Sequence, residues 1–125
     1  ELRVLERALT DILTAAVDCF QADDPAAAKL VEPLEETIDR LTDEIRARHI
    51  HRLQSGECTV QLGFILNDLL TNLERVSDHC SNIAVCVIEE REDHAEQRHA
   101  FLHDFKAAGE FTESLDKDLR KYKLP

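Results

Sequence analysis

The longest regular pattern of apolar positions lies in the second half of the chain. Between residues 58 and 91, apolar side chains recur at alternating intervals of four and three residues. This seam consists of Leu62, Leu66, Leu69, Leu73, Val76, Cys80, Ile83 and Val87. Such a repeat is the heptad pattern of helices that pack side by side. It predicts a long helix over residues 58–91 that buries the seam against its neighbours.

Other segments show the spacing of amphipathic helices. They cover residues 2–21, 25–54 and 110–122. Asp24 suits the N-cap of the second of these helices, Pro25 suits its first position, and Ser55-Gly56 supplies its stop. Pro33 lacks a backbone donor and predicts a kink in the early turns. The expected fold is all-α, an up-and-down bundle of three long helices with a shorter C-terminal helix.

Composition and charge argue against several classes of function. The formal net charge is −11 and no basic stripe is visible, so we expect no binding to nucleic acid, whose phosphates would repel the chain. No apolar run approaches the roughly 20 residues of a membrane helix. The four cysteines form no CxxC pair, which favours a reduced, cytosolic compartment.

The chain contains no Met and opens at Glu1 inside a helical pattern, so we expect residues 1–125 to be a single domain excised from a longer protein.

Two carboxylate pairs with the same spacing predict a metal site. Glu35 and Asp39 are four residues apart, as are Glu74 and Asp78, and the predicted turn lies between the pairs. In an antiparallel helical hairpin, position i faces about position 113 − i, so Glu35 is level with Asp78 and Asp39 with Glu74. Carboxylate oxygens bind hard and borderline cations. These four acids are the predicted metal ligands.

A helical wheel adds supporting candidates and an orientation. Glu36, Asp43 and Asn82 lie on the same two stripes as the four acids. Both stripes lie opposite the apolar faces, so the acids are expected to point outward, away from the core. Outward stripes favour a multinuclear cluster or separate weak ions over one ion bridging all four carboxylates.

Several alternatives stay open from the residues alone. An acidic stripe opposite an apolar seam is also what any solvated helix shows. A di-metal carboxylate enzyme needs inward Glu residues and two Glu-x-x-His motifs, and only Glu96-x-x-His99 is present. His99 and His103 have the spacing of a zinc pair, and His79 beside Asp78 has the setting of a phosphotransfer histidine. We expect the chain not to be an enzyme. A metal-independent helical module for protein interaction in phosphate signalling is the main alternative.

Two segments carry a resemblance to a known family. Residues 67–84, NDLLTNLERVSDHCSNIA, resemble the signature helix of PhoU-type phosphate-regulatory domains, with its E-R-[IV]-[GS]-D-H core followed by N-I-A. Residues 35–45, EETIDRLTDEI, are similar to the family's other acidic helix. The resemblance implies a three-helix bundle whose E(D)xxxD motifs, here the two acid pairs, hold multinuclear iron or other divalent or trivalent metal ions on the surface. It also implies a regulatory role that links phosphate availability to transport and signalling.

A finer resemblance concerns the parent protein. Gly63-Phe64, Cys80 and the ending KYKLP look most like the cytoplasmic C-terminal domain of bacterial sodium-dependent phosphate cotransporters. This likeness implies a regulatory domain of such a transporter, on the cytoplasmic side of the plasma (inner) membrane. The partners it implies are the transporter's membrane domain in the same chain and phosphate-signalling proteins. A homodimer is also expected, because full-length PhoU has two bundles in tandem and this chain has one.

Overall fold

A computed structural model describes residues 1–92 and 103–125, and every regular element in these residues is helical. The helices are α1 (Leu2–Ala22), α2 (Pro25–Ala28), α3 (Val31–Gln54), α4 (Val60–Glu92) and α6 (Gly109–Lys121). Residues 103–106 form a further helical turn. Apart from the start of α3, the long helices begin and end within about two residues of the predicted positions, and the all-α prediction is confirmed.

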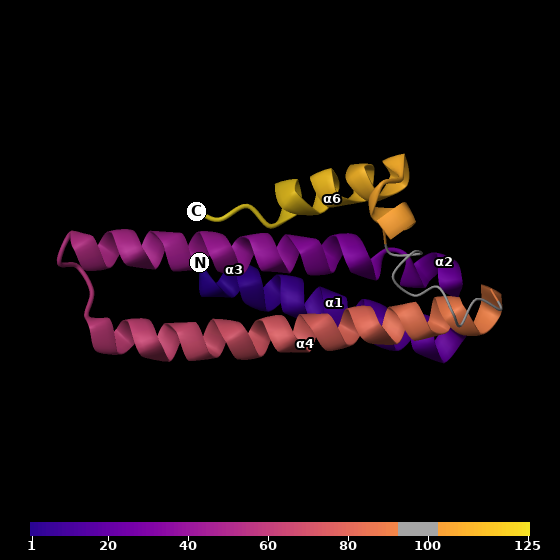
Figure 1. The fold of residues 1–125 in the computed structure, drawn as a ribbon, viewed down its shortest axis with the longest axis horizontal. Helices are drawn as coiled ribbons and strands as arrows, with labels where there is room; N and C mark the ends of the chain where they lie inside the picture. The colour runs from indigo at the N-terminus through magenta and orange to yellow at the C-terminus, as the bar shows by residue number, and fades with distance from the viewer. Residues whose placement is uncertain (93–102) are drawn as a thin grey trace.

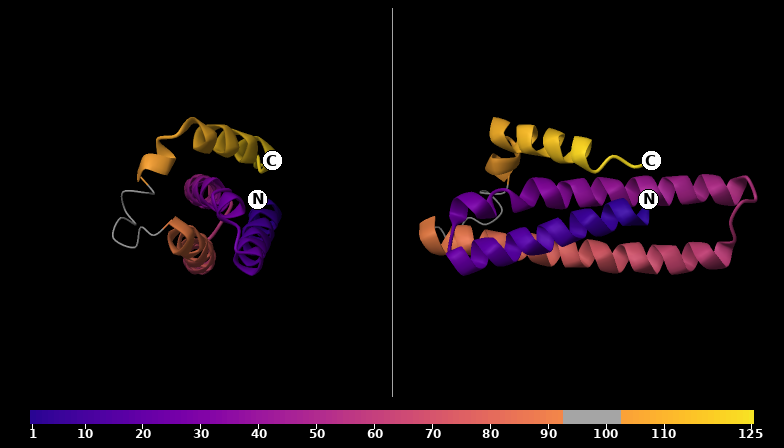
Figure 2. Two further views of the ribbon diagram at one scale, coloured as in Figure 1. Left: turned by 90° about the vertical axis from the view of Figure 1, so that its right-hand side faces the viewer. Right: turned by 180° about the vertical axis from the view of Figure 1, so that it is seen from behind.

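The three long helices form the up-and-down bundle (Figure 1). α1 and α4 run in one direction and α3 runs in the other. α6 packs on α3, on the side away from α4 (Figures 1 and 2). The core lies among α1, α3 and α4 and includes Leu5, Ile12, Ile38, Ile45 and Leu70. This arrangement leaves the groove between α3 and α4 open on one face.

The predicted helix over residues 25–54 is divided into two. Asp24 caps α2 as expected, because its side chain accepts hydrogen bonds from the backbone N–H groups of Ala26 and Ala27 at 2.9 and 3.2 Å. α2 ends at Ala28, and α3 begins at Val31. The break falls at the fourth residue before Pro33, where the proline ring would clash with the carbonyl of a continuous helix. Pro33 instead lies in the first turn of α3, where backbone N–H groups have no helical partner.

The prediction that α4 buries its whole heptad seam is wrong. Leu62, Leu69 and Ile83 are exposed, whereas Ser77 and Ser81, which lie outside the seam, are buried. The reason is that α4 contacts both α1 and α3, so its buried face is turned toward α3. Small serine side chains allow the two helices to approach closely there.

The C-terminal residues are fixed by polar contacts to α1 and α3. Tyr122 is buried, and its hydroxyl donates to the Asp11 carboxylate, which also pairs with Lys121 at 2.7 Å. Arg48 donates to the Pro125 carbonyl at 2.6 Å. These contacts hold α6 and the segment after it against the bundle. The predicted Glu96-x-x-His99 motif and the His99 member of the zinc pair lie outside the described residues.

Candidate metal centre

The register between α3 and α4 determines which acids meet. The relation predicted from the sequence pairs position 32 with position 81, and Ser81 Oγ donates to Glu32 Oε2 at 2.6 Å. Farther toward the turn, Thr42 Oγ1 donates to Glu74 Oε1 at 2.5 Å. The two helices are therefore antiparallel and in the predicted register, to within about one turn. Their facing residues line one groove.

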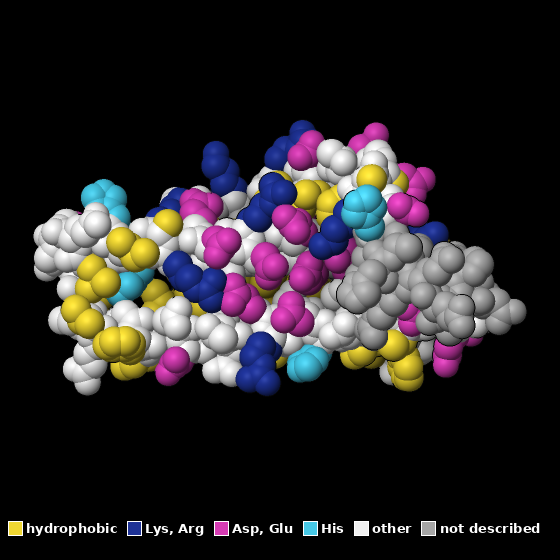
Figure 3. Space-filling model, in the orientation of Figure 1, with side chains coloured by type: hydrophobic (Ala, Val, Ile, Leu, Met, Phe, Trp, Pro, Cys, Tyr) yellow, Lys and Arg dark blue, Asp and Glu magenta, His cyan; other side chains and the backbone are white. Residues whose placement is uncertain are grey.

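Three of the four predicted ligands come together in this groove. Glu35 and Asp39 of α3 and Asp78 of α4 each offer a carboxylate oxygen, and these oxygens lie within 4.8 Å of one another. We call these residues the carboxylate triad. Asp and Glu side chains gather in the middle of the face formed by α3 and α4 (Figure 3). A group of carboxylate oxygens this close together suits a hard cation.

The expectation that the acids point away from the bundle is wrong for α3. Glu35 and Asp39 are only partly exposed, and Glu35 Oε2 is buried with no hydrogen-bond partner. Asp78 is exposed and closes the triad from the solvent side. The physical reason is that α3 packs against α4, α6 and α1, so its buried face is wide and reaches the acidic stripe. An unpaired, buried carboxylate oxygen needs either a proton or a cation.

The triad repels its own negative charge. Burial, followed by repulsion from Glu32 and Asp39, raises the pKa of Glu35 to about 8. Burial and repulsion from Asp78 and Glu74 raise the pKa of Asp39 to about 6. At neutral pH the metal-free protein therefore keeps a proton on Glu35. A bound cation would replace this proton and neutralise the repulsion.

Two cationic side chains flank the triad along the groove. On the side nearer the hairpin turn, Arg46 forms a bidentate pair with Glu74 at 2.6 and 2.7 Å, which lowers the pKa of Glu74. On the other side, Lys106 pairs with the buried Glu32 at 3.0 Å. Each of these acids is already matched by a positive charge. The uncompensated negative charge is concentrated in the triad between them.

This geometry agrees with a family comparison. A family model for the PhoU domain matches residues 2–87, which is more than half of the chain. The chain belongs to the PhoU family. PhoU domains are regulatory and not catalytic, and membership implies a role in the regulation of phosphate transport. No curated protein and no solved structure matches the chain in the corresponding comparisons.

The other predicted site residues of this PhoU domain lie around the triad. Glu74 is adjacent but bound to Arg46, as described above. Glu36 pairs with Arg40 at 3.0 Å, and the largely exposed Asp43 pairs with Arg46 at 3.3 Å. Asn82 is exposed, one helical turn from Asp78, and is not part of the triad. Among the described residues, the carboxylate triad is the group whose donor atoms converge closely enough for one ion.

Sequence reasoning missed the two flanking cations of the PhoU domain. Arg46 lies two turns beyond Asp39 on the same stripe of α3, so the helical wheel contained the signal. Lys106 follows α4 at a distance in the chain, and no spacing rule links it to Glu32. Its pairing with Glu32 is a contact between distant segments of the chain, which only the structure shows. Within residues 1–92 and 103–125, none of the helices combines the length and the hydrophobicity that a membrane span requires.

Proposed function

We propose that this PhoU domain is the cytoplasmic regulatory domain of a sodium-dependent phosphate cotransporter and that it binds metal ions at the carboxylate triad. The likeness of Gly63-Phe64, Cys80 and the KYKLP ending to cotransporter domains supports the transporter assignment. In this proposal the partners are the membrane domain of the same chain and phosphate-signalling proteins. The metal ion is a structural link between α3 and α4 and not a catalyst.

The single observation that carries the metal proposal is the unpaired, buried Glu35 Oε2 inside the triad. Glu35, Asp39 and Asp78 would hold the ion, and the carboxylate donor set suits iron in its trivalent state, manganese or another hard cation. Glu74 would join them only by exchanging its Arg46 contacts for the ion. A multinuclear cluster of the kind that the family resemblance implies would require this exchange, because three carboxylates alone offer few bridging oxygens.

Metal binding to the triad is testable by metal content and thermal unfolding. The protein is stripped with chelator, and ferric, manganese, zinc or calcium ions are then added. An ion at about 100 times its dissociation constant should stabilise the fold by about 2.7 kcal/mol. Asp78→Asn should abolish both the stabilisation and the bound metal. Asp43→Asn is the matched control, because Asp43 is exposed on α3 and lies outside the triad.

The outcomes separate this proposal from its main alternative. If the wild-type protein and Asp78→Asn retain equal metal, the triad assignment fails. If no ion binds the wild-type protein, the metal-independent interaction module is the better description. The exposed apolar side chains of Val60, Phe64 and Ile65 specifically favour that second candidate.

A further inference from the structure

A cysteine and a histidine meet at the turn that joins α3 to α4. Cys58 lies between the two helices, and its Sγ is 3.7 Å from His49 Nδ1 and 3.9 Å from His49 Nε2. The other contact of the thiol is with the Thr59 carbonyl oxygen, also at 3.9 Å. Hydrogen bonds between a nucleophile and its base are often this long before a reactant binds. Cys58 and His49 therefore combine a nucleophile with a base within reach of it.

The fold makes room for the imidazole of this pair. His49 is only 7% exposed, and its ring lies against Gly63 in the first turns of α4. A Cβ at position 63 would lie 2.9 Å from His49 Nε2, so a larger residue would displace the ring. Glycine is otherwise a poor helix former. In the part of the chain that the structure describes, the Cys58 thiol is the group that contacts the His49 ring nitrogens, so the ring remains able to accept its proton.

Positive charge also lies close to the sulfur. Arg52 follows His49 by about one turn of α3, and its guanidinium interacts electrostatically with Cys58. The same guanidinium pairs with Glu1 at 2.9 Å, and Glu57 is the neighbouring acid in the turn. A guanidinium near a thiol favours the negative charge that the sulfur acquires when it reacts.

The other three cysteines lack this combination. Cys19 and Cys80 are buried, and burial raises the pKa of both thiols, which keeps them protonated and shielded. Cys86 is exposed on α4, but its thiol takes part in none of the hydrogen bonds between residues of segments 1–92 and 103–125. Exposure alone would make Cys86 the most reactive thiol, whereas the neighbouring side chains favour the less exposed Cys58.

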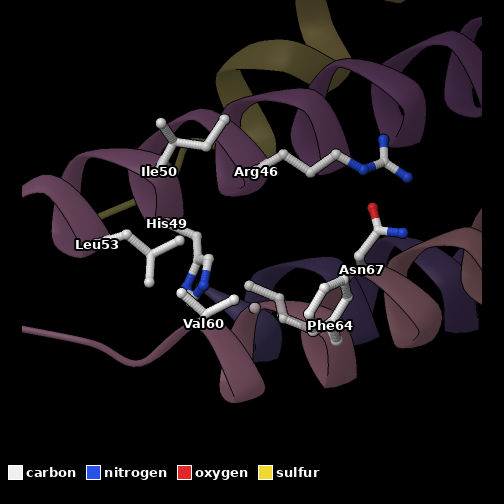
Figure 4. Close-up of a pocket in the computed structure, with 9 residues that line it drawn as sticks. Arg46, His49, Ile50, Leu53, Val60, Phe64 and Asn67 are labelled. Atoms are coloured by element: carbon white, nitrogen blue, oxygen red, sulfur yellow. The ribbon is translucent and has the colours of Figure 1, made fainter.

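Space for a small reactant lies beside the imidazole. His49 lines a groove of about 320 Å³ between α3 and α4, together with residues that include Leu53, Val60 and Phe64 (Figure 4). This volume is in the range of sites that hold small organic molecules. Cys58 itself is partly exposed. A small molecule can therefore approach the cysteine and the histidine without displacing a helix.

We propose that Cys58, with His49 as its base, is a site of covalent modification by low-molecular-weight disulfides. His49 takes the thiol proton, and the Cys58 sulfur attacks one sulfur of the disulfide. The S–S bond of the disulfide breaks as a new S–S bond to Cys58 forms, and the departing thiolate receives the proton from His49. The disulfide is the oxidant, and half of it leaves as a reduced thiol. The step needs no metal ion, and an added thiol reverses it.

The test is a competition between two cysteines of the same folded chain. The wild-type protein, in chelator, reacts with a substoichiometric amount of dithiodipyridine, an uncharged disulfide, and peptide mass spectrometry measures the modified fraction of each cysteine. Cys58 should react at least about 10-fold faster than Cys86. His49→Gln should remove most of this advantage and leave the rate at Cys86 unchanged. His51→Gln is the matched control, because His51 is exposed on the same helix, and it should keep the advantage.

Circular dichroism and a measurement in urea keep fold and reactivity separate. In the urea-unfolded wild-type chain, Cys58 and Cys86 should react at similar rates, because His49 is no longer held beside the sulfur. A folded wild-type chain in which Cys58 reacts no faster than Cys86 overturns the proposal without reference to any variant. So does an advantage of Cys58 that survives unfolding, a folded His49→Gln chain that keeps the full advantage, or an equal loss of it in His51→Gln.

Discussion

Replacing Glu35 with Gln removes the most strongly perturbed acid of the carboxylate triad. Burial and neighbouring acids raise the pKa of Glu35 from an ordinary 4.5 to about 8. The folded protein therefore holds a proton that the unfolded chain releases above about pH 4.5. The contribution of Glu35 to the free energy of unfolding is fully present below that pH and is lost as the pH rises through about 8. A glutamine cannot ionise, so its contribution stays constant over this range.

The magnitude follows from the change in proton affinity. Each tenfold change is worth about 1.4 kcal/mol, so a pKa rise from 4.5 to about 8 corresponds to at most about 5 kcal/mol. Glu35 is only partly buried, and water and counter-ions screen the repulsion it feels. We therefore expect the free energy of unfolding of the wild-type protein to fall by about 1–2 kcal/mol as the pH rises through about 8. Glu35→Gln should not show this loss.

The difference in free energy of unfolding between the two proteins is measured by urea unfolding in chelator at about pH 5 and about pH 8.5, with circular dichroism as the signal. Asp39, whose pKa is raised to about 6, titrates in both proteins, so the difference between them reports Glu35 together with its repulsion of Asp39. Glu36→Gln is the control, because Glu36 is the neighbouring acid but pairs with Arg40 at 3.0 Å. It should lose stability with pH as the wild type does. Equal pH dependence in the wild type and Glu35→Gln would refute the electrostatic account of the triad.

Two further substitutions test the polar contacts that frame the site and the fold. Arg46→Met should lower the free energy of unfolding by about 1–2 kcal/mol in urea melts, because it leaves the partly buried Glu74 without its bidentate partner. Retention of wild-type stability would show that solvent replaces this pair at no cost. Tyr122→Phe should cost about 1 kcal/mol, because the buried hydroxyl that donates to Asp11 is lost while the ring remains. An unchanged melting curve for Tyr122→Phe would show that this hydroxyl does not stabilise the fold and that the other contacts of the C-terminal segment hold it in place.

The helices themselves were predictable because local rules determine them. The α1 pattern, the Asp24 cap and the turn after α3 each depend on residues close together in the chain. Gly56, with a φ of 76°, adopts the left-handed conformation that the turn needs and that glycine allows. The division of the second helix was missed because Pro33 was expected to bend a continuous helix and not to start a new one. Both outcomes accommodate the missing backbone donor of Pro33, and in this bundle the helix is interrupted at residues 29–30.

The rotation of α4 could not be read from its own spacing. Its apolar seam predicts one buried face. Because α4 contacts both α1 and α3, the face that is actually buried lies between the side that faces α1 and the side that faces α3. In this orientation of α4, Leu69 and Ile83 are exposed, and Ser77 and Ser81 are buried. α3 is likewise covered on several sides, because it packs against α4, α6 and α1, and desolvation there raises the pKa values of Glu35 and Asp39. Each helix packs against more than one neighbour, and the pattern of a single helix does not show this; the predicted core residues and the predicted environment of the acids were wrong for this reason.

The antiparallel register, in contrast, was predictable because it depends only on the position of the turn. Counting from that turn correctly placed Glu35 near Asp78, although it could not decide which acids stay free for a cation. Glu74 and Asp78 have the same four-residue spacing as Glu35 and Asp39. Even so, Arg46 of α3 donates two short hydrogen bonds to Glu74. A guanidinium bound in this way competes directly with a metal ion for the same oxygens. The composition of the site is thus set by contacts between helices, and residue spacing within one helix cannot report them.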